Sequence, residues 1–480
     1  MNSKHLATDL IIPLSRPEYP AVPEAFLSAL AWKAFTPKVL PNAASGKKLG
    51  LRFKLQDIHS LAKSVEYFET VPSGDKFSDL SAALQNNGVE SLGTIQIVTD
   101  ALITSIEGTS KNKSKFIPAS PLTPSLALMQ NVIGALGKAN PPDIGNILEQ
   151  IYCLGNAGSP TSGVASNYSK ACEVRLGHDP ILDTIDRSLA EVVWGGVTPN
   201  APIAYSEESS IVNHLSNTPF TWFASAWDKI TSESWVLALP ARVWVDWATA
   251  ILRSAYAMAY LWESCWYEAV AKAVLSNTPS EQIDFETIRR NMDTPVTWRS
   301  IETPTEIKDL GSKLKWRNEK SVQIRKHLIV WLQNEDFKEL TLSEFVDAIR
   351  SKASFKNDLE EALNPDKSKQ ASASKLLWEA TKYSLLTREQ NDYYGLLQSS
   401  GRYLYTSPGI EWCAMVASLA SSGPGVSANL GQVVSELQNM GIRCSSNEVL
   451  RLLEKAGLAR GSADADLAVE VESAFKGAAK

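Results

Sequence analysis

One segment of the chain limits the possible folds more than any other. From Ala241 to Leu275 the sequence contains 35 residues without a glycine or a proline, and Pro240 directly precedes them. Proline is favoured in the first turn of a helix, whereas glycine and proline destabilise helix interiors. We therefore predict one continuous helix over Ala241–Leu275, about 50 Å long at a rise of about 1.5 Å per residue.

The polar residues of this helix form a single stripe. They recur at steps of three or four residues, which places them on one side of a helix. The members of the stripe are Arg242, Asp246, Thr249, Arg253, Tyr256, Tyr260, Glu263 and Tyr267. The other faces carry large apolar side chains such as Trp244, Ile251 and Trp262. A helix that is apolar over most of its circumference must be enclosed by other elements, so we expect it at the centre of the fold.

The stripe has two interpretations. In the first, Arg242, Asp246, Arg253 and Glu263 line a groove or cavity that receives a partner or a ligand. In the second, the stripe is the narrow solvent-exposed face of the helix, and Arg242 pairs with Asp246 at i, i+4 for about 0.2–0.5 kcal/mol. We favour the second interpretation because helices normally have one exposed stripe, and we keep the four charged residues as interface candidates.

Tryptophan is enriched around the same helix. The chain has 14 tryptophans beside 13 tyrosines and 13 phenylalanines. Seven of the 14 fall within 45 residues: Trp222, Trp227, Trp235, Trp244, Trp247, Trp262 and Trp266. This enrichment predicts a bulky core in the central part of the chain.

Composition and charge exclude several classes of protein. A chain of 480 residues with 44% hydrophobic and 21% charged residues is neither disordered nor fibrous, and a net charge of −6 excludes a uniformly basic nucleic-acid coat. Five scattered cysteines without a CxxC pair indicate a reducing compartment. The N-terminus lacks an apolar run of signal-peptide length, and the most apolar window, Trp247–Trp262, is too short for a membrane span and contains Arg253. We therefore expect a cytoplasmic protein that does not enter the membrane.

We predict a mainly α-helical, multi-helical fold in four parts. Residues 1–125 form a small mixed α/β region, with a strand at Leu49–Leu55 where apolar and polar residues alternate. Residues 126–278 form a tryptophan-rich helical domain, and residues 279–405 form a more charged helical region. Residues 406–480 form a helix-turn-helix module that resembles a winged helix.

The helix-turn-helix prediction depends on two helices with a short turn between them. The first, Ser427–Met440, has its apolar residues on one face and ends at Gly441, and the second begins at Ser445, which is spaced from Glu448 as in a capping box. Its candidate contacts with DNA or a partner are Arg443, Arg451 and Lys455. Residues 409–480 carry six basic and eight acidic side chains, a balance unfavourable for binding phosphates. A protein-docking or structural role is therefore favoured over direct DNA binding.

A basic segment lies upstream, at Lys313–His327. Its six lysines and arginines stand against one acid, Glu319, and a tryptophan lies inside the run. Cation-rich grooves with stacking aromatic rings bind single strands and phosphate backbones. The candidate nucleic-acid- or partner-binding residues are Lys313, Lys315, Trp316, Arg317, Lys320, Arg325 and Lys326. We favour the alternative, a solvated helix face whose tryptophan belongs to the core, because charge runs are usually surface.

The sequence contains no established catalytic motif. Asp179, Asp183 and Asp186 share one helical face and suit Mg²⁺, but we favour a solvated helix start, because Asp179 precedes Pro180 and acids are favoured in a first helical turn. Phosphate-binding GxxxxGK[ST], GxSxG, HExxH and Rossmann glycine patterns are absent, and the five histidines are far apart in sequence. We therefore predict no catalytic residue, no metal and no cofactor, and favour a non-enzymatic role.

These observations favour a non-enzymatic subunit of a multi-protein DNA-transacting system, such as a bacterial phage-defence or DNA-modification system. Other protein subunits are the expected partners. DNA is a further candidate partner, contacted through the C-terminal helix-turn-helix and the basic helix. The alternatives are a metal-dependent nuclease or phosphoryl-transfer enzyme that uses the three aspartates, and a scaffold that binds protein alone.

Overall fold

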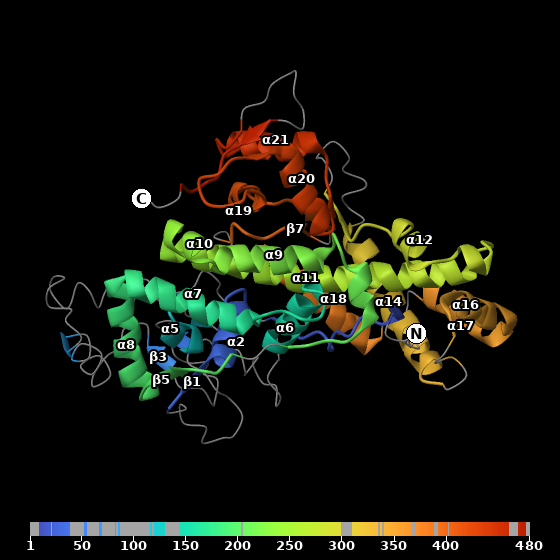
Figure 1. Cartoon of the computed structure of the whole chain (residues 1–480), viewed down its shortest axis with the longest axis horizontal. Coiled ribbons are helices and arrows are strands. Elements are labelled where there is room, and N and C mark those ends of the chain that lie inside the picture. The colour runs from blue at the N-terminus through green and yellow to red at the C-terminus, as the bar shows by residue number, and fades with distance from the viewer. Residues whose placement is uncertain are drawn as a thin grey trace.

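The computed structural model describes residues 9–20, 22–38, 52–54, 67–69, 82, 85–86, 116–117, 120–129, 144–202, 205–298, 310–334, 337, 340–366, 371–387, 392–401, 403–459 and 469–476. Within these residues the protein is mainly α-helical, with 16 α-helices and a few short strands (Figure 1), which confirms the predicted helical class. None of the described helices is both long and apolar enough to cross a lipid bilayer. The α/β character of residues 1–125 stays a prediction, because most of these residues lie outside the described ones.

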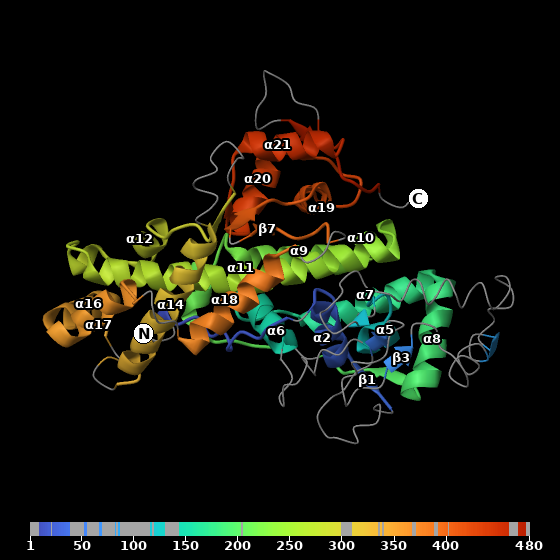
Figure 2. The same cartoon turned by 180° about the vertical axis from the view of Figure 1, so that it is seen from behind.

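The predicted central helix is α11, Ala241–Leu275, and its bounds are those expected from the sequence. It runs through the middle of the molecule with other helices above and below it (Figures 1 and 2). Every residue from Trp247 to Ala271 is buried, including the charged and tyrosyl members of the stripe in that range. The expectation of an enclosed central helix is therefore confirmed.

Three helices pack along α11 over much of its length. They are α9 (Pro219–Thr231), α14 (Leu310–Leu332) and α18 (Ser372–Leu385). The seven tryptophans clustered around α11 in sequence are at most 5% exposed. They form the bulky core that their clustering predicts. Near the C-terminal end of α11 lie three further helices: α12 (Phe285–Arg290), α16 (Leu342–Ser351) and α17 (Ala353–Leu363). A short helix, α10 (Glu233–Ala238), joins α9 to α11.

A second group of helices lies below α9 and α11 in Figure 1. It contains α2 (Ala25–Ala34), α5 (Pro124–Met129), α6 (Ile144–Gly155), α7 (Val164–His178) and α8 (Pro180–Trp194). The short strands β1 (Phe35–Pro37) and β5 (Val197–Pro199) pair antiparallel beside it. The strand β2 (Arg52–Lys54), inside the predicted strand Leu49–Leu55, pairs with β3 (Tyr67–Glu69) and β4 (Phe116–Ile117).

The C-terminal part lies on the opposite side of α11 (Figures 1 and 2). It follows the hairpin of β7 (Leu397–Ser400) and β8 (Tyr403–Thr406), and its helices are α19 (Ile410–Ala420), α20 (Leu430–Asn439) and α21 (Ser446–Lys455). The strands β9 (Ala428–Asn429) and β11 (Glu470–Val471) pair antiparallel, and Ala459 forms a bridge with Val471. Of the three helices, α21 lies farthest from α11.

The turn between α20 and α21 contacts the helical body directly. Its strand β10 (Ile442–Arg443) pairs parallel with β6 (Val296–Thr297). Gly441 has φ +84°, and a Cβ at this position would lie 3.0 Å from Pro295 and 3.1 Å from Met258 of α11. The glycine predicted to end the first helix is therefore needed both for its left-handed backbone and for this close approach.

Gly155 marks a second close approach, between α6 and α9. A Cβ at this position would lie 2.1 Å from the carbonyl oxygen of Phe220. We predict that Gly155→Ala lowers the free energy of unfolding by about 1–3 kcal/mol, the usual cost of overpacking. Gly177→Ala in α7 is the matched control, because a methyl group there meets nothing within 4 Å. Urea denaturation measures both variants, and equal stability of the two would contradict the close approach.

Candidate functional site

The polar stripe of α11 is largely buried, so the favoured expectation of a solvent-exposed stripe is wrong for most of its length. Arg253 is 2% exposed and Glu263 is 6% exposed. Arg242 and Asp246, at the start of the helix, remain partly exposed. The difference arises because segments distant in sequence, among them residues 9–20, cover the stripe.

Three tyrosines of the stripe bind the backbone of residues 9–20. The Tyr256 hydroxyl donates to the Glu18 carbonyl oxygen and accepts from the Glu18 N–H, both at 2.6 Å. The Tyr260 hydroxyl donates to the Ser15 carbonyl oxygen at 2.7 Å. The Tyr267 hydroxyl accepts from the Ile12 N–H at 3.1 Å. An extended segment needs such partners because buried backbone groups are costly when unpaired. The three tyrosines of the stripe therefore hold residues 9–20 against α11.

Arg253 makes the most completely paired contact of the stripe. Its guanidinium forms a two-pronged pair with Asp392, at 2.8 and 3.1 Å, and both residues are buried. It also donates to the carbonyl oxygens of Ser384 at 2.6 Å and Leu386 at 2.9 Å, at the end of α18. Arg253 thus joins α11 to the C-terminal end of α18.

Arg242 and Asp246 form the predicted i, i+4 pair, at 3.1 Å. They line a cleft of about 40 Å³ that also contains Arg253 and Glu24, so the structure brings three of the four interface candidates together. Burial raises the pKa of Asp246, and Arg242 opposes this effect. The cleft has room for a water molecule or two, and not for an organic ligand.

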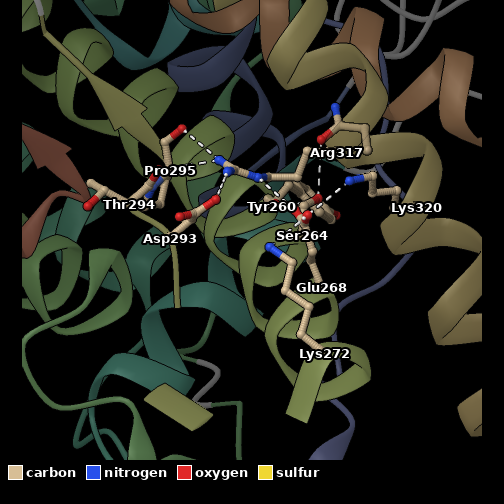
Figure 3. Close-up of polar contacts among 10 residues, drawn as sticks. Tyr260, Ser264, Glu268, Lys272, Asp293, Thr294, Pro295, Arg317 and Lys320 are labelled. Carbon is tan, nitrogen blue, oxygen red and sulfur yellow. Dashed lines mark hydrogen bonds and ion pairs between the residues drawn. The ribbon is translucent and has the colours of Figure 1, made fainter. Parts of the chain in front are cut away.

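The basic segment lies on α14, which faces the core with one side. Arg317 is 3% exposed and reaches between α11 and the loop before β6 (Figure 3). It donates to Glu268 at 3.2 Å and to Asp293 at 2.7 Å, and its Nη1 lies 3.3 and 3.4 Å from the carbonyl oxygens of Thr294 and Pro295. A role in binding nucleic acid would require all these contacts to break.

Glu268 is the centre of this ion network (Figure 3). Its carboxylate accepts from Arg317 and from Lys320 at 3.0 Å and forms an ion pair with Lys272 at 3.1 Å, while the residue is only 6% exposed. Burial alone would raise the pKa of Glu268, but Lys320, Lys272 and Arg317 together lower it to about 2. The carboxylate is therefore charged at any pH at which the protein is ordinarily studied.

The other candidates of the basic segment do not share a surface. Lys313 and Lys326 are exposed, yet 13 residues of helix separate them by about 20 Å along α14 and by roughly 140° around it. Lys315 lies 5.1 Å above the ring of Trp316, and both are partly exposed. The favoured interpretation, a solvated helix face whose tryptophan belongs to the core, is therefore wrong for Arg317, which is buried, and for Trp316, which is partly exposed.

Arg325 turns toward Glu263 of the stripe. Its Nε lies 3.4 Å from Glu263 Oε1, and neither atom has a hydrogen bond although both are buried. Burial raises the pKa of Glu263 to about 7, and Arg325 opposes this effect. The structure thus joins one interface candidate to one candidate of the basic segment.

The candidates of the C-terminal part are all exposed. Arg443 lies in the turn before α21, and Arg451 and Lys455 lie on α21. None of the three forms an ion pair with another residue in the described part of the chain. The Ser445 side chain caps α21 by accepting from the Glu448 N–H at 3.3 Å, which is one of the two contacts of the predicted capping box.

The three aspartates of α8 are each engaged separately. Asp179 caps the helix by accepting from the Leu182 N–H, Asp183 pairs with Arg187 at 2.6 Å, and Asp186 accepts from the Ser125 N–H at 2.8 Å. Within the described residues no three acidic, histidine or cysteine side chains are grouped so as to hold a metal ion. These contacts fit the favoured interpretation of a helix start.

Sequence reasoning missed the partners of the buried arginines. Glu268 and Asp293 pair with Arg317, and Asp392 pairs with Arg253. For Glu268 a signal was present, since an acid four residues before Lys272 on an apolar helix is expected to pair. Asp392 lies 139 residues from Arg253, and the sequence contains no signal that identifies it as the partner of Arg253.

Comparison with protein-family models and with curated proteins gives no match to this chain.

Proposed function

We propose that the chain is a non-enzymatic subunit of a multi-protein DNA-transacting assembly and that its C-terminal module contacts DNA or a partner protein, with DNA as the case tested below. The observation that carries the proposal is the set of exposed, unpaired cations on and beside α21. Arg443, Arg451 and Lys455 are available among the described residues, whereas Arg317 is committed to the core. Cations that are not neutralised within the protein are those that gain most from releasing counterions from DNA.

The order of elements supports assigning a winged helix to the module. A helix (α19) and a short strand (β9) precede two helices (α20 and α21), and Val471 pairs with Ala459 after them. In a helix-turn-helix the second helix of the pair enters the major groove. That helix is α21, the outermost of the three in Figure 1. Arg443 lies in the turn before it, Arg451 in its middle and Lys455 at its last residue.

The attachment of the module supports the role of a subunit. The turn that carries Arg443 pairs with β6, and the Trp298 N–H donates to the Arg443 carbonyl oxygen at 2.7 Å. Just before β6, Thr294 and Pro295 accept from Arg317 of the core network. The module is thus fixed on the helical body, as expected for one part of a larger assembly.

We predict that Arg451→Glu combined with Lys455→Glu weakens binding to duplex DNA at least tenfold. The slope of log affinity against log salt should fall by about two, because each phosphate contact contributes about one. Fluorescence anisotropy with labelled duplex and single-stranded DNA over a salt series measures both quantities.

The matched control is Arg187→Glu combined with Lys356→Glu, which changes the charge equally at two exposed ion pairs far from α21. This variant should bind as the wild type does. Absence of binding to either DNA at low ionic strength, or equal loss in both double variants, would refute the proposal. A stable protein partner that purifies without nucleic acid would then point to a protein-only scaffold.

A further inference from the structure

A cavity of about 460 Å³ lies where α11, α14, α18 and residues 14–17 meet. Its size is typical of pockets for small organic molecules, about 300–1,000 Å³. Part of its wall is apolar, formed by Leu14, Ile329, Val330 and Leu377 among others. Val330 is 59% exposed and adds to the apolar surface at the mouth of the cavity. The cavity thus presents apolar surface that no described residue covers.

The charged part of the wall favours an anion. It contains Arg16, Arg325 and Lys326 against the single acid Glu263. Arg16 and Lys326 are exposed, and the Arg325 side chain is 35% exposed. A ligand that enters the cavity therefore meets three cations, of which Arg325 is the one flanked by buried groups.

The pair of Glu263 and Arg325 is incompletely formed. Glu263 is 6% exposed, lines the cavity and has no hydrogen bond at Oε1, and Arg325 Nε also lacks one. Arg325 also interacts with the Tyr267 hydroxyl, and its Nη2 lies 3.4 Å from the Leu14 carbonyl oxygen. Buried polar atoms without partners are costly, and a guanidinium binds a carboxylate best through two parallel hydrogen bonds. Arg325 Nε is itself buried, but the side chain is 35% exposed, so a ligand in the cavity would make such a two-pronged contact through Nη1 and Nη2.

We propose that this cavity binds a small organic acid with an apolar body, whose carboxylate pairs with Arg325 and whose body packs against Leu14, Ile329 and Leu377. Glu263 competes with the ligand for Arg325. The inference concerns a surface separate from α21 and does not depend on DNA binding.

The competition gives binding a defined pH dependence. Glu263 faces Tyr260 and Tyr267 on its own helix, Arg325 and Lys326 on α14, and Arg16 from the N-terminal segment, while α18 contributes apolar residues. Burial keeps both tyrosines neutral by raising their pKa, and Glu263 raises the pKa of Arg325, so Glu263 is the group that titrates near neutral pH. Its protonation removes the competing charge.

Isothermal titration with octanoate and with octan-1-ol, an uncharged analogue, tests the proposal on the full chain. Octanoate should bind the wild type more tightly than octan-1-ol. Octanoate should also bind about tenfold more tightly at pH 6 than at pH 8, because Glu263 is mostly protonated only at the lower pH. Equal affinity for the two compounds, or absence of binding by both, would overturn the inference. Tighter binding of octyl phosphate than of octanoate would contradict the assignment to carboxylic acids.

Two variants separate the roles of the pair. Arg325→Met should weaken octanoate binding about tenfold to a hundredfold and leave octan-1-ol unaffected, since it removes a charged two-pronged contact. Glu263→Gln should bind octanoate at pH 8 as tightly as the wild type does at pH 6. The control Arg290→Met removes an arginine that is 72% exposed and pairs with Glu286. If Arg325→Met does not fold, the pH profile of the wild type still decides, and a flat profile excludes the competition.

Discussion

Replacing Glu268 with alanine is expected to lower the free energy of unfolding by about 3–5 kcal/mol, the cost of removing one partner from a buried ion pair. The variant would leave Arg317 inside the protein, 3% exposed, with Asp293 as its remaining acidic partner, and would also remove the acceptor of Lys320. Urea denaturation followed by tryptophan fluorescence measures the change. Glu286→Ala, which removes an 80% exposed partner of Arg290, should change stability by less than about 1 kcal/mol.

The depressed pKa of Glu268 predicts that the free energy of unfolding depends on pH. The pKa of Glu268 in the folded protein is about 2, below the ordinary value of 4.5. A group whose pKa is depressed by folding stabilises the protein above its unfolded pKa, and this stabilisation is lost as the pH falls through the folded pKa. The contribution is therefore complete above about pH 5 and lost between about pH 4.5 and 2. Glu268→Gln should lose less stability than the wild type over that window, and parallel loss in the two proteins would contradict this role.

The central helix was predictable because its signals are local. The absence of glycine and proline from Ala241 to Leu275, with Pro240 before them, fixes its bounds, and the mostly apolar circumference requires that it be enclosed. The capped starts at Asp179 and Ser445 were predictable for the same reason, since a cap involves residues three positions apart.

The exposure of the charged residues was not predictable from local patterns. The stripe fits a solvent face until the segment from Ile12 to Glu18, some 240 residues away, is placed on its tyrosines. In the same way, Arg317 belongs to a run of cations that is typical of a surface, and only Glu268, 49 residues away on another helix, brings it inside. Periodicity places a side chain on one face of a helix, but the element that covers that face is set by tertiary packing.

Because tertiary packing covers part of it, the basic segment of α14 does not present its cations on one surface. Arg317 and Lys320 stabilise the junction of α11 and α14, Arg325 faces Glu263, and Lys313 and Lys326 are exposed on different sides of the helix. The cations of this one segment thus pair in the core, line a cavity or lie exposed to solvent.

Arg253→Ala is expected to destabilise the protein about as strongly as the loss of Glu268, by about 3–5 kcal/mol. The Asp392 carboxylate would lose its two-pronged partner in a buried site, and the carbonyl oxygens of Ser384 and Leu386 would lose a charged donor. These carbonyls lie at the C-terminal end of α18, where a positive charge is favourable. Arg242→Ala, which breaks a partly exposed pair on the same helix, should cost less than about 1 kcal/mol.

A double variant distinguishes the pair from the space that it fills. Arg253→Met combined with Asp392→Leu replaces both charges with apolar groups of similar length, so it leaves no unpaired charge and should recover most of the stability lost in Arg253→Ala. Urea denaturation of the single and double variants gives the coupling energy between the two residues. If the double variant is as unstable as Arg253→Ala, the carbonyl contacts at the end of α18 carry the stabilisation instead of the ion pair. If Arg253→Ala costs no more than Arg242→Ala, the prediction that Arg253 fastens α11 to α18 is wrong.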